Sequence, residues 1–149
     1  MSSSPASDVA ENVRVPGAMI GLDTNVLVRY VMQDDPRQSP KATRLIESLT
    51  SDQPGFVPLV AIVELVWVLS SSYGLNRDQI AEALNLLLRS KELVIDRAER
   101  VLQAQRRFSQ GGADFADCLI ERIARAQGCE TTMTFDAAAV KSAGMTLVA

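Results

Sequence analysis

The sequence predicts an α/β fold in which a short parallel sheet is covered by helices on both faces. Short apolar runs that suit buried strands alternate along the chain with longer segments whose apolar residues recur at helical spacing. Single strands alternate with helices, rather than standing in blocks, which is the pattern of a parallel sheet built from crossover connections.

The first half of the chain begins with a strand and a helix. The first predicted strand is Met19–Leu22, and Asp23 starts a helix directly after it. Ser39 and Pro40 are typical of an N-cap followed by a first helical residue, so we expect the second helix to begin there. The other elements of this half are a strand at Phe56–Val57, a helix over about 58–72 and a helix capped by Asn76.

The second half continues the alternation. A strand at Leu93–Ile95 ends at Asp96, and the helix after it ends at Gly111-Gly112. A further helix begins near Asp114 and stops at Gly128, because glycine accepts the left-handed conformation found at helix C-termini. We expect the last elements to be a strand at 131–135, a helix at 136–143 and a strand at 145–148.

Composition limits the chemistry that the chain can carry. The 149 residues are 47% hydrophobic and 22% charged, which suits one compact domain with a sizeable core. The absence of histidine excludes Ser-His-Asp hydrolases, Cys-His proteases and His-ligated zinc, and two cysteines argue against a structural zinc site. Any bound metal must therefore be held by oxygen atoms, which favours Mg²⁺ or Mn²⁺.

Charge and hydropathy bear on partners and location. The net charge of −3 and the pI of about 5.0 argue against a globally basic, nucleic-acid-binding surface. No apolar run reaches the roughly 18 to 20 residues of a membrane span, and the low cysteine usage favours the cytoplasm. Residues 1–18 lack the apolar core of a secretory signal. We expect them to be a vector-derived or disordered extension before Met19, with the folded domain over 19–149.

Acidic residues stand where a parallel sheet collects its ligands. Asp23 and Asp136 each follow a predicted strand, and the carboxyl ends of parallel strands form the ligand-binding edge. Glu64 and Asp117 lie inside helices that meet the core, where an unpaired carboxylate is costly. Two carboxylates about 4 Å apart repel by roughly 4 kcal/mol at an effective dielectric near 20, and a divalent cation turns that repulsion into attraction.

The helix from Asp114 to Gln127 places acids beside its apolar face. Asp117 falls at the edge of that face, and Asp114 and Glu121 lie three and four residues away from it. The predicted face consists of Phe115, Ala116, Leu119, Ile120, Ile123 and Ala124.

Each acid also has a simpler explanation, which the sequence leaves open. Asp23, Asp114 and Asp136 are well placed to cap helices, and for Asp114 capping is the favoured role. Glu64 would be solvated if the helical phase differed from the one assumed. We interpret Asp96 and Glu121 as structural or surface residues.

Four motifs occur in a fixed order between Met19 and Ala149. They are LDTNVL at 22–27, Glu64 within a helix, DFADCLI at 114–120 and TFD at 134–136. Together they resemble the PIN-domain nucleases and, more narrowly, the VapC-type toxins of bacterial toxin–antitoxin pairs. The resemblance implies a three-layer α/β/α sandwich with a short, mostly parallel sheet, and Mg²⁺- or Mn²⁺-dependent cleavage of RNA. It also implies a homodimer that a small antitoxin protein neutralises.

The resemblance assigns roles to individual positions. Asp23 and Asp117 match the principal metal ligands of the family, Glu64 its glutamate and Asp136 its fourth acid. Asp114 matches an additional acid found in some members only. The polar residues near the pocket, which orient acids or water, are matched by Thr24, Asn25 and Thr134.

Other functions fit parts of the same pattern. A phosphotransfer or phosphatase domain would use Asp23 as a nucleophile, but it needs a nearby lysine, and Lys141 is poorly placed for that role. A non-catalytic binding module would be indicated by the loss of an acid, and none is lost. A PIN nuclease that processes RNA without being a toxin is the third alternative.

Overall fold

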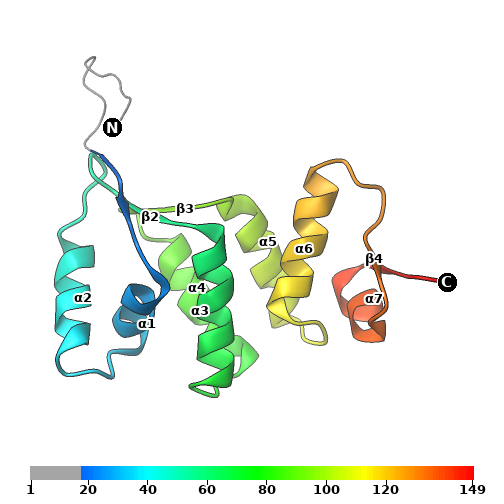
Figure 1. Cartoon of the computed structure of the whole chain (residues 1–149), viewed down its shortest axis with the longest axis horizontal. Helices are drawn as coiled ribbons and strands as arrows, with labels where there is room; N and C mark the ends of the chain where they lie inside the picture. The colour runs from blue at the N-terminus through cyan, green and yellow to red at the C-terminus, as the bar shows by residue number, and fades with distance from the viewer. Residues whose placement is uncertain (1–17) are drawn as a thin grey trace, which may run out of the picture. The chain divides into compact units, whose positions relative to one another are not determined.

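A computed structural model describes residues 18–149, which contain seven helices and five strands (Figure 1). The extension expected at 1–18 lies outside the described residues except for Ala18, so its boundary stays a prediction. No helix within residues 18–149 is long and apolar enough to cross a membrane. In chain order the elements are β1 (Ile20–Gly21), α1 (Thr24–Met32), α2 (Gln38–Glu47), β2 (Gly55–Val57), α3 (Leu59–Ser71), α4 (Arg77–Leu88), β3 (Leu93–Ile95), α5 (Ala98–Ser109), α6 (Phe115–Ala126), β4 (Met133–Thr134), α7 (Ala137–Ala143) and β5 (Thr146–Leu147).

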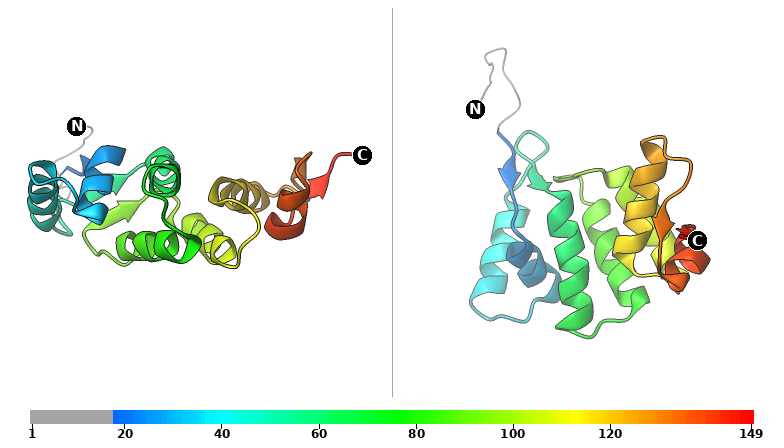
Figure 2. Two further views of the ribbon diagram at one scale, coloured as in Figure 1. Left: turned by 90° about the horizontal axis from the view of Figure 1, so that it is seen from below. Right: turned by 45° about the vertical axis from the view of Figure 1, so that its right-hand side comes forward.

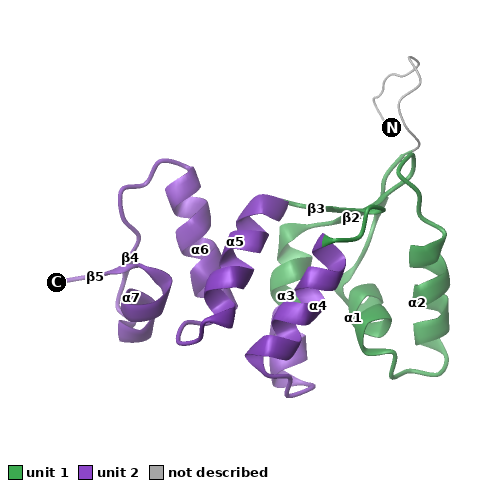
Figure 3. Ribbon diagram, turned by 180° about the vertical axis from the view of Figure 1, so that it is seen from behind, with its two compact units in different colours: residues 1–65, 89–96 green, residues 66–88, 97–149 purple. Residues whose placement is uncertain are grey.

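The chain divides into two compact units, which Figure 3 shows in different colours. Unit 1 holds the described residues through Leu65 and the segment Arg89–Asp96. Unit 2 holds Val66–Leu88 and Arg97–Ala149, so the boundary falls inside α3. Each unit therefore has its own strands and its own share of the acidic residues.

A three-stranded parallel sheet in the order β1-β2-β3 lies in unit 1. Ile20 pairs with Gly55, which in turn pairs with Leu93. Gly55 has no room for a side chain, because a Cβ there would lie 2.8 Å from Cδ1 of Leu49 and 2.9 Å from Cδ1 of Leu22. This close packing holds β1 against β2, just before the turn that leads into α1.

The start of α2 differs from the prediction that Ser39 would cap it. The helix begins at Gln38, because the Asp35 carboxylate accepts hydrogen bonds from the backbone N–H groups of Arg37 (2.9 Å) and Gln38 (2.7 Å). Ser39 is instead buried, and its hydroxyl donates to the carbonyl oxygen of Arg29 at 2.9 Å. The N-cap position is thus Arg37, and the side chain that satisfies the first N–H groups is Asp35, earlier in the chain than the Ser-Pro pair suggests.

Asp96 and Asn76 have the structural roles expected of them. Oδ2 of Asp96, directly after β3, accepts a hydrogen bond from the N–H of Leu59 at 3.1 Å, which secures the start of α3. Before α4, the Asn76 side chain accepts from the N–H of Gln79 while the Gln79 side chain accepts from the N–H of Asn76, both at 2.9 Å. This reciprocal arrangement is a capping box.

Unit 2 contains α4 to α7 and a second parallel ladder formed by β4 and β5. Successive helices pack on one another, α4 on α5, α5 on α6, and α6 on α7 (Figure 2). The sequence predicts one sheet, whereas the described strands form two ladders. The N–H groups of Thr146 and Val148 donate to the carbonyls of Thr132 and Thr134, which pairs β5 with β4. Both ladders are parallel, so the predicted α/β class is confirmed.

The buried face of α6 is rotated relative to the predicted one. Phe115 and Leu119 are buried as expected, and Cys118 is buried with them. Ile120, which the prediction places on the same face, is 52% exposed. The periodicity of apolar residues is therefore only part of what orients this helix.

Glu121 explains the rotation. Its side chain is only 2% exposed and forms ion pairs with Arg122 and Arg125, the second at 3.0 Å. A carboxylate that accepts charged donors can be buried, whereas an unpaired one cannot. Glu121 is thus a structural residue, and the alternative that it lies at the surface is wrong.

Candidate active site

Asp23 combines a capping role with an accessible carboxylate. It has extended backbone dihedrals at the N-cap of α1, and its Oδ1 accepts a hydrogen bond from the N–H of Thr24 at 2.8 Å. The residue is exposed, and a carboxylate has two oxygen atoms with about four acceptor positions. The capping bond occupies only one of these positions, so capping and metal binding do not exclude each other.

Glu64 lies close to the same turn. Its Oε1 accepts a hydrogen bond of 2.6 Å from the hydroxyl of Thr24, across 40 residues of sequence. Of the two placements that the sequence leaves open for Glu64, the solvated one is confirmed, because the residue is exposed while Ile62 and Leu65 on the same helix are buried. Thr24 thus links the start of α1 to an acid on α3 within unit 1.

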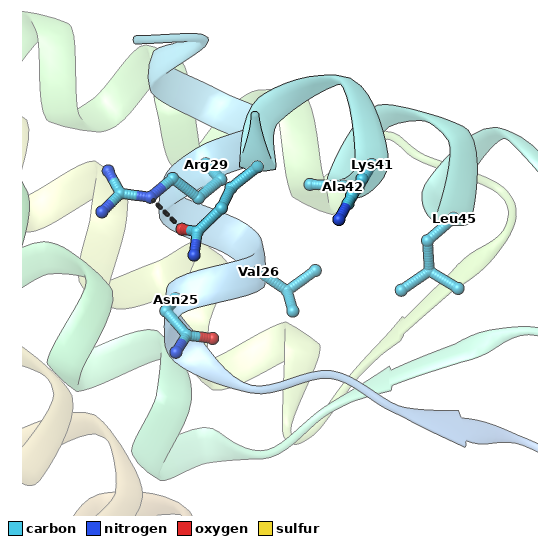
Figure 4. Close-up of a pocket in the computed structure, with 7 residues that line it drawn as sticks. Asn25, Val26, Arg29, Lys41, Ala42 and Leu45 are labelled. Atoms are coloured by element: carbon cyan, nitrogen blue, oxygen red, sulfur yellow. Dashed lines mark hydrogen bonds between the residues drawn. The ribbon is translucent and has the colours of Figure 1, made fainter. Parts of the chain in front are cut away.

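Asn25 is placed differently from the acids. It lines a cavity of about 250 Å³ between α1 and α2, which pack against each other (Figure 4). At this cavity Nε of Arg29 donates to Oε1 of Gln38 at 2.9 Å. None of the predicted acids lines it. The lining residues are Asn25, Val26, Arg29, Gln38, Lys41, Ala42 and Leu45.

Unit 2 brings two acids together at the start of α6. Asp114 is the N-cap, and its Oδ1 accepts a hydrogen bond from the N–H of Asp117 at 2.8 Å. The capping role favoured for Asp114 is therefore confirmed. Asp114 is exposed, while Asp117, in the first turn of the helix, is half-buried.

Asp136 caps a second helix of unit 2. Its Oδ1 accepts from the N–H of Ala138 at 2.9 Å, and its own N–H donates to Oγ1 of Thr134 at 3.0 Å. Thr134 stands in β4, so its hydroxyl links this strand to the backbone of Asp136. Like Asp114, Asp136 is exposed.

The carboxylates of unit 2 influence one another. Burial raises the pKa of Asp117 most, followed by the charge of Asp114, a side-chain hydrogen bond with Asp114 and the charge of Asp136. The three groups are therefore close enough for repulsion to disfavour the ionised form of the middle one. Such a set of oxygen atoms suits a hard divalent cation, which would relieve the repulsion.

Two residues of the surroundings escape prediction from sequence. Glu121 gives no sequence signal except that Arg122 and Arg125 lie one and four residues later, a spacing equally typical of a solvated helix face. Arg77 donates to two backbone carbonyls around the turn before α6, and its only signal is a cation at the first position of a helix.

The expected acids are thus shared between the units, with Asp23 and Glu64 in unit 1 and Asp114, Asp117 and Asp136 in unit 2. Within residues 18–149 no three or more His, Cys, Asp or Glu side chains, the aspartates of unit 2 included, stand in an arrangement that could hold a metal ion as they are. In unit 2 the capping bonds hold Oδ1 of Asp114 and of Asp136 on backbone N–H groups. The donor set is right for Mg²⁺ or Mn²⁺ by its chemistry.

Two comparisons with known proteins bear on this site. Residues 20–144 match the PIN domain family. The chain is also similar to a VapC ribonuclease from Aquifex aeolicus (strain VF5), with 25% identity over 114 residues. That similarity covers 76% of this chain and 84% of the relative.

Proposed function

The chain belongs to the PIN-domain family, and from this premise we propose that it is a ribonuclease that requires a divalent metal ion. The observation that carries the proposal is the group of three aspartates in unit 2, where burial and neighbouring carboxylates raise the pKa of Asp117. A protein gains nothing in stability from crowding like charges. The arrangement is explained if the crowded oxygen atoms serve a cation.

The metal ligands in this proposal are the acids that the sequence singles out. Asp23 and Asp117 are the principal ligands, Glu64 and Asp136 are the further ones, and Asp114 contributes where its capping bond leaves an oxygen free. When bound, Mg²⁺ or Mn²⁺ supplies a water of lowered pKa and polarises a phosphoryl oxygen.

Polar neighbours prepare two of these acids. The hydroxyl of Thr24 donates to Oε1 of Glu64 and so orients that carboxylate. The hydroxyl of Thr134 in β4 accepts from the N–H of Asp136 and fixes the backbone of that residue. We propose that Asn25 belongs to the surroundings of the site because it follows Asp23 and Thr24 at the start of α1, although the cavity that it lines holds none of the acids.

The capping bonds prepare the acids that begin helices. They fix Oδ1 of Asp23, Asp114 and Asp136 on backbone N–H groups, so each side chain is held in one orientation. Side chains that are already held lose less conformational entropy when they bind a ligand. Capping therefore favours metal binding in this proposal rather than competing with it.

We further propose that the protein is the toxin of a toxin–antitoxin pair in the cytoplasm, with a small antitoxin protein as its partner. The similarity to a VapC ribonuclease supports this role, and both cysteines are free thiols, as expected in a reducing compartment. We also propose a homodimer. Supporting this, five large apolar side chains of unit 2 are at least half exposed, namely Trp67, Ile120, Met133, Phe135 and Leu147.

The decisive experiment is cleavage of a structured RNA pool by the purified protein in Mg²⁺, in Mn²⁺ and in EDTA. We expect cleavage in either metal, none in EDTA, and none by Asp117→Asn or Asp23→Asn. Asp78→Asn, which changes an exposed aspartate in the first turn of α4, is the matched control and should cleave normally. Cleavage by Asp117→Asn at the wild-type rate would show that the site is assigned wrongly.

Two further measurements address the biological role. Expression of the wild-type protein in a bacterial host should arrest growth, and expression of Asp117→Asn should not. Active enzyme without growth arrest would favour an RNA-processing nuclease over a toxin. Light scattering coupled to size-exclusion chromatography measures the mass directly, and a monomer would contradict the homodimer.

A further inference from the structure

Arg77 occupies a position that is electrostatically unfavourable for a cation. It is the first residue of α4, and the N-terminus of a helix carries a partial positive charge. In the described part of the chain it forms no ion pair with a carboxylate. Some other interaction must therefore hold this side chain in place.

That interaction joins the two ends of a turn in unit 2. Nη1 of Arg77 donates to the carbonyl oxygen of Phe108 at 3.1 Å and to that of Ala113 at 2.6 Å. The guanidinium carbon also lies 4.6 Å from the centroid of the Phe108 ring, a cation–π arrangement. Phe108 in turn packs edge-on against Phe115, with ring centroids 6.0 Å apart. Arg77 thus holds the end of α5 and the start of α6 together.

The turn between these helices is tightly determined. Gly111 and Gly112 have φ angles of 96° and 97°, which residues with a side chain rarely adopt. A Cβ on Gly112 would clash with the side chain of Ser142 on α7, so the backbone of the turn rests directly on that helix. The turn has little freedom to rearrange while the Arg77 hydrogen bonds are in place.

The turn leads directly into the acidic residues. Ala113, whose carbonyl Arg77 holds, precedes Asp114, and Asp114 accepts the hydrogen bond from the N–H of Asp117. We propose that Arg77 is a positioning residue, which fixes the first turn of α6 and so sets Asp114 and Asp117 for binding a divalent cation. The inference rests on the proposed function, because it presumes that these aspartates bind metal.

The hydrogen bonds to carbonyls, rather than the positive charge, carry the effect. A guanidinium group is planar and presents several N–H donors in a fixed fork, whereas the lysine ammonium group is a compact charge on a flexible stem. Arg77→Lys keeps the charge, but its shorter side chain does not carry a nitrogen atom to the position of Nη1, and it lacks the planar group that lies over the Phe108 ring. Arg77→Met keeps the apolar stem and removes both charge and donors. Both variants should therefore behave alike.

The test measures Mn²⁺ binding by electron paramagnetic resonance of the free ion, on the full chain without RNA. We expect Arg77→Lys and Arg77→Met to weaken Mn²⁺ binding at least about tenfold, the lower end of the range of losses known for groups that orient metal ligands. Ile80→Val is the matched control, because Ile80 is buried on the same helix and its truncation lowers stability while Arg77 and its two hydrogen bonds to the turn are kept. It should bind Mn²⁺ as the wild type does. Wild-type binding by both Arg77 variants, or equal weakening by Ile80→Val, would overturn the inference.

A second readout separates this inference from the proposed function. Hydrogen exchange of the Asp117 amide, measured by NMR without metal, reports on its bond to Asp114. Faster exchange in Arg77→Lys than in Ile80→Val supports the positioning role, and unchanged exchange overturns it. Equal Mn²⁺ binding by the wild type and Asp117→Asn would instead reject the metal site, whatever the exchange data show about the turn.

Discussion

Replacing Asp117 by asparagine should stabilise the metal-free protein, the opposite of what most substitutions do. The side chain is half-buried and its pKa is raised by burial and by the charges of Asp114 and Asp136. Asparagine has nearly the same shape and removes the charge that these neighbours disfavour. Relief of the repulsion should therefore appear as a gain in the free energy of unfolding.

The size of the gain follows from two opposing effects. Two carboxylates about 4 Å apart repel by about 1 kcal/mol in water and by about 4 kcal/mol near a protein surface, and exposure of Asp114 and Asp136 favours the lower figure. A negative charge in the first turn of a helix is itself favourable by about 0.3–1 kcal/mol. Because the pKa of Asp117 is raised, the unfavourable effects outweigh the favourable one. We expect a net gain of about 0.5–1 kcal/mol, or roughly 1–4 °C in Tm.

The assay is thermal unfolding at about pH 8, well above the ordinary aspartate pKa, in EDTA and again in Mn²⁺. In EDTA, Asp117→Asn should melt above the wild type, and in Mn²⁺ the order should reverse. A ligand at about 100 times its Kd adds about 2.7 kcal/mol to a protein that binds it and nothing to one that does not. Asp78→Asn, the same change in the first turn of α4, should show neither effect. A lower Tm for Asp117→Asn than for wild type in EDTA would show that repulsion between these carboxylates does not destabilise the metal-free protein.

Four further outcomes follow from the structure. Since the pKa of Asp117 is raised on folding, the folded chain binds its proton more tightly than the unfolded chain does, so metal-free stability should fall as the pH rises from about 3.9 through the folded pKa. The free energies of unfolding of wild type and Asp117→Asn, measured with urea at several pH values across that range, test this prediction. A difference between the two proteins that stays the same at every pH would contradict it. Asp23→Asn should lower the rate of RNA cleavage by at least about 100-fold with little change in Tm, because asparagine also caps helices well. Glu121→Gln should lower the free energy of unfolding by about 2 kcal/mol, less than the roughly 3–5 kcal/mol of a fully buried pair because Arg125 is exposed; a urea midpoint equal to wild type would show that the ion pairs are inert. Gly112→Ala should cost about 1–3 kcal/mol through its positive φ and its contact with Ser142, and the same change at Gly21, where a Cβ meets nothing within 4 Å, is the control.

Local sequence signals predict the elements of this fold well and their assembly less well. The strand Leu93–Ile95 and the helix cap at Asn76 are correct because each depends on residues close in sequence. The division of the strands into two ladders depends on which backbone groups meet after folding, and no local pattern encodes that. The start of α2 escapes prediction for a related reason, since Asp35 accepts from the first N–H groups while Ser39 bonds to the distant carbonyl of Arg29.

The candidate site shows the same limit. Capping by Asp23, Asp114 and Asp136 can be predicted because each acid stands directly before a helical pattern. The exposure of Glu64 cannot, because α3 is apolar on most of its surface and its periodicity does not define one face. Arg77 and Ala113 meet across 36 residues. Their hydrogen bond cannot be predicted from residue types, because every residue carries the backbone carbonyl that accepts it.

The capping bonds have a consequence for how this protein would change if its activity were lost. Asp23, Asp114 and Asp136 each begin a helix, so folding would continue to select for a short polar side chain at these positions after selection for catalysis had ended. Inactive descendants should accumulate Asn, Ser or Thr there, whereas Asp117, which caps nothing, should vary freely. Position 117 is therefore the one whose identity best separates a working descendant from a decayed one.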